Sequence, residues 1–195
     1  MTTQYQWIEH SDAVFSVPGF FDPVEAEALA HLSERHGFEP AQVRVGAFTD
    51  HNTQSLPNIR NNEKCIIELP GIVSDIWKRL QELPLPEIEN QIPVGLPSSL
   101  RFYKYSPGQR FKMHKDGAWQ ENGLWSRLTL LIYLNDWVEG GETDFKTFRI
   151  QPQAGTLVLF KHKTWHEGTE VKAGTKLVLR SDVLYGPKQE KDSNE

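Results

Sequence analysis

The chain has 195 residues, a formal net charge of −5 and a single cysteine. This length suits one compact domain with a sizeable core. One cysteine cannot form an internal disulfide or a thiolate metal cluster, so Cys65 favours a reducing compartment. The acidic balance argues against nucleic-acid binding, and no stretch approaches the ~18–20 apolar residues of a membrane span. Since the N-terminus also lacks signal-peptide features, we expect a cytoplasmic protein with neither nucleic-acid nor membrane partners.

Two helices are predicted in the N-terminal half. Asp22 and Glu25 fit a capping box around Pro23, and Gly37 is the expected stop of this helix. Its predicted apolar stripe consists of Val24, Ala28, Leu29 and Leu32. A second helix is expected from about residue 71 to residue 83, before a proline. Between the helices, residues 42–48 and 59–69 look strand-like, with a polar loop around 50–57.

From residue 98 onward the hydrophobic period is two. Strands are predicted at 98–106, 110–116, 127–134, 141–145, 148–151, 156–161, 165–171 and 175–185. Short strands with tight turns and no intervening helix indicate an antiparallel sandwich or jelly roll, with the helices packed outside one sheet. We therefore expect one mainly β domain over residues 1–185, in which 1–97 support a core at 98–185. The polar tail at 186–195 is expected to be disordered.

The segment around His114 suggests a metal site. On a strand, residues i and i+2 point the same way, so His114 and Asp116 can share one ion such as Fe(II), Mn(II) or Zn(II). The second histidine is either His162 or His166. We favour His166 because it begins a strand, whereas His162 fits a surface loop or a position behind the ligands. Two histidines and one carboxylate leave open positions, as an iron oxygenase requires.

Lys176 follows His166 by ten residues and suggests an anchor for an anion. On a strand it shares a face with Val178, Arg180 and Asp182. A lysine inside an apolar interior is costly unless a carboxylate meets it, and a dicarboxylate such as 2-oxoglutarate would offset that cost. In the alternative, this face is solvated and the intervening leucines form the core. Alternation alone does not choose between the two.

Together these segments resemble the Fe(II)/2-oxoglutarate-dependent dioxygenases, and among them the prolyl 4-hydroxylase-like branch. The matching segments run in order across about residues 100–185: YSPGQRFKMHKD from Tyr105, LLIYLN from Leu130, GGET from Gly140, IQP from Ile150, GTLVLF from Gly155, HEGTEV from His166 and GTK from Gly174. Their order and spacing make the resemblance specific. It implies a double-stranded β-helix (jelly roll) with the metal at its open end.

The resemblance also implies residue roles. It assigns Fe(II) to His114, Asp116 and His166, and it gives Lys176 the distal carboxylate of 2-oxoglutarate. Tyr105 resembles the family tyrosine that hydrogen-bonds this cosubstrate, although strand packing is its alternative role. No catalytic acid or base is needed beyond the metal centre.

Three further residues are candidates for the cosubstrate site. Thr129 resembles a family threonine that meets the same carboxylate, or it is an ordinary strand residue. Tyr133 lies on the same strand face and either joins the site or only packs there. Arg180 lies four residues beyond Lys176. It can bind the other end of the cosubstrate, bind an acidic substrate or pair with Asp182.

The implied activity is hydroxylation of an unactivated C–H bond. It would consume 2-oxoglutarate and O₂ and release succinate and CO₂, with ascorbate as a candidate reductant. The substrate is expected to be a prolyl or other residue of a peptide, or else a small molecule. Candidate substrate contacts are Arg60, Trp119 and Trp125, for which a polar turn and loop packing are the alternatives. The competing functions are a small-molecule hydroxylase or desaturase, a non-catalytic jelly-roll binding or sensing protein, and a zinc hydrolase.

Overall fold

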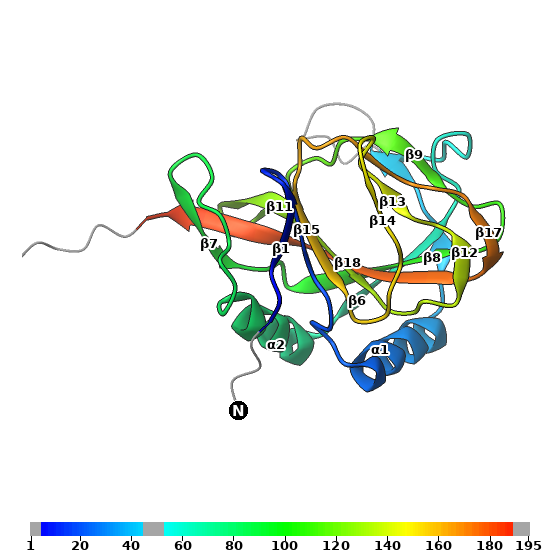
Figure 1. The fold of residues 1–195 in the computed structure, drawn as a ribbon, viewed down its shortest axis with the longest axis horizontal. Coiled ribbons are helices and arrows are strands. Elements are labelled where there is room, and N and C mark those ends of the chain that lie inside the picture. The colour runs from blue at the N-terminus through cyan, green and yellow to red at the C-terminus, as the bar shows by residue number, and fades with distance from the viewer. Residues whose placement is uncertain (1–4, 45–52, 189–195) are drawn as a thin grey trace, which may run out of the picture.

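A computed structural model describes residues 5–44 and 53–188 of the chain (Figure 1). The helices are α1 (Pro23–His36) and α2 (Pro70–Leu80). The strands are β1 (Ile8–Ser11), β2 (Val14–Val17), β3 (Glu39–Pro40), β4 (Val43–Arg44), β5 (Thr53–Gln54), β6 (Glu63–Glu68), β7 (Gln91–Gly95), β8 (Ser99–Tyr105), β9 (Phe111–His114), β10 (Gln120–Glu121), β11 (Leu124–Tyr133), β12 (Val138–Gly140), β13 (Thr143–Asp144), β14 (Arg149–Ile150), β15 (Leu157–Lys161), β16 (His166–Gly168), β17 (Val171–Gly174) and β18 (Lys176–Pro187). Neither helix of this described part is long and apolar enough to cross a membrane.

The strands form two main antiparallel sheets, which confirms the predicted jelly roll. The larger sheet has the order β1-β2-β15-β11-β18-β8-β6-β3, and the smaller sheet has the order β14-β13-β16-β9. Side chains of both sheets meet in one apolar cluster, which includes Tyr133 and Val178 of the larger sheet and Ile150 of the smaller. The space between the sheets is therefore partly filled by this cluster.

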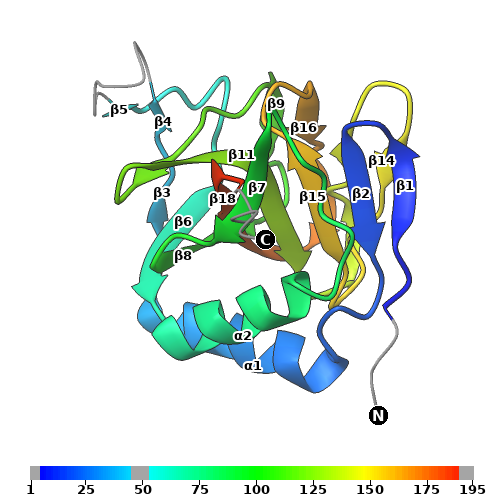
Figure 2. The same cartoon turned by 90° about the vertical axis from the view of Figure 1, so that its left-hand side faces the viewer.

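Both helices cover the other face of the larger sheet, as predicted (Figure 2). The capping box of α1 is present: the backbone N–H of Glu25 donates to Asp22 Oδ1 at 2.8 Å, and the backbone N–H of Asp22 donates to Glu25 Oε2 at 2.9 Å. Arg79 of α2 forms an ion pair with the same Glu25 and so ties the two helices together. Helix α2 buries Ile76 and Leu80 and ends three residues earlier than expected.

The predicted apolar stripe of α1 is only partly correct. Val24 is 73% exposed, and the buried residues of the helix are Ala26, Leu29, Ala30 and Ser33. Three of these four side chains are small, and the hydroxyl of Ser33 donates to the Ala30 carbonyl at 2.7 Å. A prediction based mainly on large apolar residues does not detect a buried face made of small ones.

Strand β18 lies at the centre of the larger sheet, between β11 and β8. Leu177 and Leu179 pack into the cluster that includes both helices. Lys176, Val178 and Arg180 point the other way and line a cavity. Both faces are therefore buried, which is why the alternation of residue types could not identify the inner one.

The two ends of the described chain also differ from the predictions. The hairpin of β1 and β2, which pairs with β15, was not expected, because four-residue strands at a sheet edge carry little periodic signal. The tail predicted to be disordered from residue 186 is wrong at its start, because Gly186 and Pro187 continue β18 and pair with β7. Residues 189–195 of that tail, and 45–48 of the strand predicted at 42–48, lie outside the described residues.

Candidate active site

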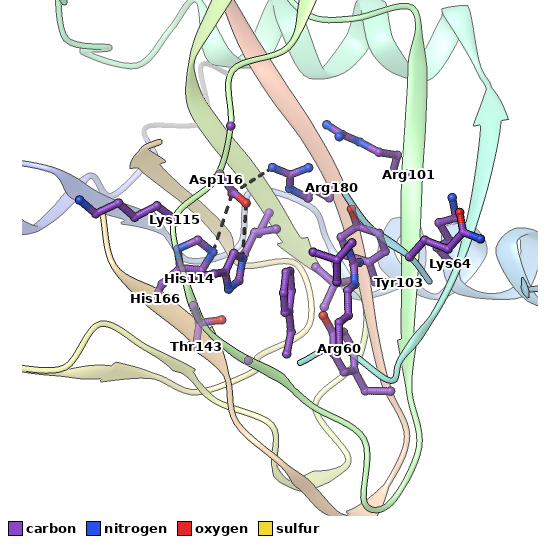
Figure 3. Close-up of a pocket in the computed structure, with 18 of the residues that line it drawn as sticks. Arg60, Lys64, Arg101, Tyr103, His114, Lys115, Asp116, Thr143, His166 and Arg180 are labelled. Carbon is purple, nitrogen blue, oxygen red and sulfur yellow. Dashed lines mark ion pairs between the residues drawn. The ribbon is translucent and has the colours of Figure 1, made fainter. Parts of the chain in front are cut away.

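A cavity of about 540 Å³ lies on the face of the larger sheet that is turned away from the helices. Its walls come from β8, β9, β16 and β18 and from the residues that follow β9. Figure 3 shows the side chains that converge there, with His114, His166 and Lys115 on one side and Tyr103 and most of the cationic side chains on the other.

Three potential metal ligands meet in this cavity. His114 ends β9, Asp116 follows two residues later, and His166 begins β16, where it pairs directly with His114 across the two strands. The ligand atoms of all three lie within 4.8 Å of one another. The Nε2 atoms of His114 and His166 are 3.5 Å and 3.8 Å from the Asp116 carboxylate (Figure 3). Such a set can hold one metal ion and leave open positions.

Backbone carbonyls orient both imidazoles for metal binding. His114 Nδ1 lies 2.8 Å from the carbonyl oxygen of Lys112, and His166 Nδ1 lies 3.1 Å from that of Thr164. A carbonyl oxygen only accepts, so each Nδ1 is the donor, and a neutral imidazole in this tautomer has its Nε2 lone pair on the side of Asp116. Burial lowers the pKa of His166 to about 4, and its imidazole is therefore neutral near pH 7.

Asp116 is held as a carboxylate. Burial by itself would raise its pKa, but Arg180, whose Nη2 lies 2.9 Å from Oδ2, holds this pKa well below its usual range. The hydroxyl of Thr129 also donates to Oδ2, at 2.6 Å. The carboxylate is thus ionised and fixed in position before any metal binds.

A chain of hydrogen bonds continues behind Asp116. Because the single hydroxyl proton of Thr129 goes to the carboxylate, His162 Nδ1 must donate to Thr129 at 3.0 Å. His162 Nε2 then accepts from Ser126 Oγ at 2.7 Å. The imidazole is buried, and burial lowers its pKa, which suits this neutral form. His162 therefore supports the ligand set from behind, and the surface-loop alternative for it is wrong.

Lys176 lies at the other end of the cavity and is 3% exposed. Its ammonium donates to the carbonyl of Gly141 at 2.6 Å and lies 5.2 Å and 5.4 Å from the ring centres of Tyr105 and Tyr133. No ion pair involves Lys176 within the described part of the chain, and burial lowers its pKa to about 7 despite the field of Glu142. A buried cation with one carbonyl partner is suited to receive a carboxylate.

The neighbours of Lys176 include one residue that the sequence did not single out. Thr143 lines the cavity, and its hydroxyl lies 2.6 Å from the Tyr133 hydroxyl. In the sequence, only its place at the end of the GGET segment could have identified it as a site residue. Gly141, with φ of +70°, packs against the Lys176 stem, where an added Cβ would lie 3.3 Å from Cδ. Tyr105 pairs directly with Lys176 across β8 and β18 and also lines the cavity.

The expectation that Thr129 meets the same carboxylate as Lys176 is wrong. Thr129 pairs with Asp182, six positions along β18 from Lys176, which is about 20 Å of strand. Its hydroxyl serves Asp116 instead. Arg180 likewise binds carboxylates of the protein, with Asp116 at 2.9 Å and Asp182 at 3.6 Å. The predicted pairing with Asp182 is therefore present, together with an unpredicted contact to the metal carboxylate.

The three candidate substrate residues are placed differently. Arg60 and Trp119 line the cavity, and the guanidinium of Arg101 lies 5.5 Å from the Trp119 ring centre. Trp125 does not line it and instead lies in β11, where it pairs with Gln120 and Tyr185. Trp119 is therefore available to a molecule bound in the cavity, whereas Trp125 belongs to the sheet.

With this geometry in view, comparison with known proteins identifies the family. Residues 100–181 match the sequence model of the 2OG-Fe(II) oxygenase superfamily. The matched segment contains the three potential ligands and Lys176. Residues 100–181 are thus an oxygenase segment with an H-x-D…H triad, of the type that uses Fe(II) and 2-oxoglutarate. Among curated proteins, none matches the chain at a significant level.

Several solved structures share the fold of this oxygenase. The viral collagen prolyl hydroxylase of Paramecium bursaria Chlorella virus-1, in complex with 2-oxoglutarate, is 23% identical with a TM-score of 0.68, over 89% of this chain and 97% of that one. A Pseudomonas putida prolyl-4-hydroxylase is 16% identical with a TM-score of 0.66, over 91% and 94%. A Trichoplax adhaerens prolyl hydroxylase bound to a hypoxia-inducible-factor peptide fragment is 16% identical with a TM-score of 0.66, over 89% and 84%. At these identities the likeness establishes the fold.

The residues present fit the two cofactors. The converging Nε2 lone pairs and the ionised carboxylate are donors that Fe(II) accepts. The ammonium of Lys176, which is buried without a carboxylate among the described residues, matches the distal carboxylate of 2-oxoglutarate. The observation that decides the fit is that both features line one cavity.

Proposed function

We propose that this oxygenase hydroxylates an unactivated C–H bond in a residue of a peptide or protein, with proline as the first residue to test. The observation that carries the proposal is the shared cavity of the triad and Lys176, which is lined with aromatic side chains and opens to solvent. Support for a peptide comes from the relatives of similar fold, which are prolyl hydroxylases, one of them bound to a peptide fragment.

In this proposal the protein supplies position and charge. His114, Asp116 and His166 would hold Fe(II), and Lys176, helped by Tyr105, would hold the distal carboxylate of 2-oxoglutarate. When bound, these cofactors supply the oxidation: one O₂ is consumed, 2-oxoglutarate gives succinate and CO₂, and a substrate C–H becomes C–OH. The side chains around the triad would direct one C–H bond of the substrate toward the metal site.

Two further expectations belong to this proposal. Ascorbate is proposed as the reductant that keeps the iron in its Fe(II) state. The cytoplasm is proposed as the location, because an Fe(II) site needs reducing conditions and Cys65 is a buried free thiol.

Turnover with defined substrates tests the proposal. The Fe(II) protein is incubated with 2-oxoglutarate, O₂ and pools of proline-containing peptides, and succinate release and peptide mass are followed together. We expect peptide-dependent succinate and a peptide gain of one oxygen atom, both lost in His114→Ala. Succinate that is stimulated by small amino acids or metabolites but by no peptide would contradict the peptide proposal and identify a small-molecule hydroxylase. Product without oxygen gain would indicate a desaturase.

A further inference from the structure

The charge of the cavity differs from that of the chain. The protein carries a net charge of −5, yet the lining residues include one carboxylate, that of Asp116, against six cationic side chains. These are Arg60, Lys64, Arg101, Lys115, Lys176 and Arg180. Positive charge gathered in a cleft with low-dielectric walls attracts anions.

Most of these cations already have an acidic or aromatic partner. Arg180 pairs with Asp116 and Asp182, and Arg101 forms an ion pair with Asp182 as well. Lys64 lies 3.5 Å from a carboxylate oxygen of Glu39. Lys115 is at the rim, with its ammonium 5.0 Å from the ring centre of Trp165.

Two buried cations remain without a carboxylate partner among the described residues, namely Lys176 and Arg60. Arg60 is 8% exposed, and its Nη2 is buried with no hydrogen-bond partner. Its Nε donates to Asn62 Oδ1 at 2.7 Å, and the guanidinium lies 4.4 Å from the ring centre of Tyr103 and 4.6 Å from that of Phe111. A buried donor in this state costs free energy unless a ligand satisfies it.

Arg60 is also fixed next to the metal site. Its backbone bridges to Phe111, and the adjacent Ile59 carbonyl accepts from the Lys112 N–H at 2.9 Å. The Phe111 ring stacks on His114 with 3.5 Å between ring centres. The guanidinium with its unsatisfied Nη2 is therefore two side chains away from the iron position, on the side of Tyr103 (Figure 3).

We propose that Arg60 binds a carboxylate of the substrate and so makes this oxygenase selective for acidic substrates. The inference rests on the proposed function, because Lys176 is then occupied by the cosubstrate and Arg60 is left for a second anion. The carboxylate can belong to a glutamate or aspartate near the oxidised residue of a peptide, or to a small acid.

The surroundings of Tyr103 support the location of this anion site. Burial would raise the pKa of this phenol, but Arg180, Arg60 and Arg101 together lower it to about 7. The positive field between these arginines is thus strong enough to favour a negative charge at that point. A bound carboxylate would experience the same field.

The test uses binding rather than turnover. The full chain is loaded with Mn(II) and saturating 2-oxoglutarate, since Mn(II) accepts the same ligands and broadens the NMR signals of molecules bound beside it. The probes are N-acetylproline against N-acetylprolinamide, and two blocked proline-containing peptide pools that differ only in glutamate against glutamine. The variants are Arg60→Gln, Arg60→Lys and Arg35→Gln, the last removing an exposed arginine of α1 beyond the other face of the sheet.

We expect an acid to bind roughly 10-fold or more tightly than its amide, because a charge-assisted bidentate contact is lost in the amide. Arg60→Gln should remove this preference, Arg60→Lys should keep part of it, and Arg35→Gln should leave it intact. The affinity for 2-oxoglutarate should not change in any of them. A preference within the N-acetylproline pair would indicate a small acid as the substrate, and a preference between the peptide pools would indicate an acidic peptide.

Three results would overturn the inference: no acid preference in the wild type, an equal preference in Arg60→Gln, or a loss of 2-oxoglutarate affinity in Arg60→Gln that matches the loss for the acid. If Arg60→Gln does not fold, Arg60→Lys still tests the contact, and the absence of an acid preference in the wild type overturns the inference without any variant. Failure of 2-oxoglutarate itself to bind would instead refute the proposed function. The acid–amide comparison between the wild type and Arg60→Gln, both with Mn(II) alone, would then still decide for or against Arg60.

Discussion

The two faces of β18 have different roles, although both are buried. On the helix side, Leu177 and Leu179 are 6% and 0% exposed and contribute apolar burial to the core. On the cavity side, Lys176 is 3% exposed and contributes a desolvated charge, which is unfavourable until an anion arrives. The helix side thus stabilises the fold, whereas the cavity side provides ligand binding and lowers the free energy of unfolding. Changes on the two faces should therefore separate the free energy of unfolding from the affinity for ligands.

The largest effect is expected where the cavity side holds the metal. His166→Ala removes one Nε2 donor and should lower 2-oxoglutarate turnover by roughly 1000-fold or more, since several kcal/mol of metal-derived stabilisation are lost. The measurement is succinate release, together with iron content after gel filtration. His31→Ala, on the exposed surface of α1, is the control and should leave both unchanged. Retention of iron and turnover in His166→Ala would refute the ligand assignment.

On the helix side, Leu179→Ala should destabilise the fold without altering the site. Deleting this fully buried side chain should lower the free energy of unfolding by about 2–5 kcal/mol. Val24→Ala changes a side chain that is 73% exposed and should stay within about 0.5 kcal/mol of the wild type. Denaturant titrations measure both. A large loss of 2-oxoglutarate affinity in folded Leu179→Ala would show that the two faces are not separable.

The pH dependence of cosubstrate binding should reveal the charge of Lys176. Its pKa in the free protein is lowered to about 7 by burial, with Glu142 opposing and the rings of Tyr105 and Tyr133 adjacent. Above this pH the folded protein must take up a proton to bind the dicarboxylate. Affinity should therefore fall about 10-fold per pH unit between about pH 7 and 10. Calorimetry in buffers of different ionisation enthalpy checks this, and binding without proton uptake near pH 8 would contradict it.

The lowered pKa of Lys176 has the opposite effect on the stability of the ligand-free protein, which should rise with pH. The unfolded lysine keeps its proton up to about pH 10.4, whereas the folded one loses it near 7, so the unfolded state binds more protons in this window. The contribution of Lys176 to stability should therefore rise as the pH increases from 7 to 10. Lys176→Met should lack this rise in urea titrations across that range.

A smaller effect is expected from the support behind Asp116. Thr129→Val removes the 2.6 Å hydrogen bond to the carboxylate and leaves His162 without its acceptor. Metal affinity should fall by about 10-fold, as is usual for groups that orient ligands. Thr156→Val is a matched control, because Thr156 is also buried but its hydroxyl has no hydrogen-bond partner. Equal metal affinities in the two variants would show that the Thr129 hydroxyl does not support metal binding by Asp116.

Much of the site was predictable from spacing along single strands. The i, i+2 relation gave His114 and Asp116, the start of a predicted strand favoured His166, and resemblance to the family decided for Lys176 and added Tyr105. The fold class followed from the change of hydrophobic period at residue 98 and from the clear caps of α1.

The remaining features depend on which strands become neighbours. The position of Thr129 is set by its pairing with Asp182, and Thr143 meets the Tyr133 hydroxyl only because β13 joins the smaller sheet. The inner face of β18 was ambiguous because both of its faces are buried. The free Nη2 of Arg60 is a property of the assembled cavity and has no counterpart in the sequence.

The most direct test of the account compares the wild type with Lys176→Met in two assays. Anaerobic titration of the Fe(II) protein with 2-oxoglutarate is followed by the weak visible charge-transfer absorption of the chelate, and unfolding of the ligand-free protein is followed in urea. We predict that Lys176→Met needs at least about 10-fold more 2-oxoglutarate for half-saturation while its free energy of unfolding is equal to or higher than that of the wild type. An unchanged 2-oxoglutarate midpoint, or a less stable Lys176→Met protein, would contradict a cavity-side lysine held in place for an anion.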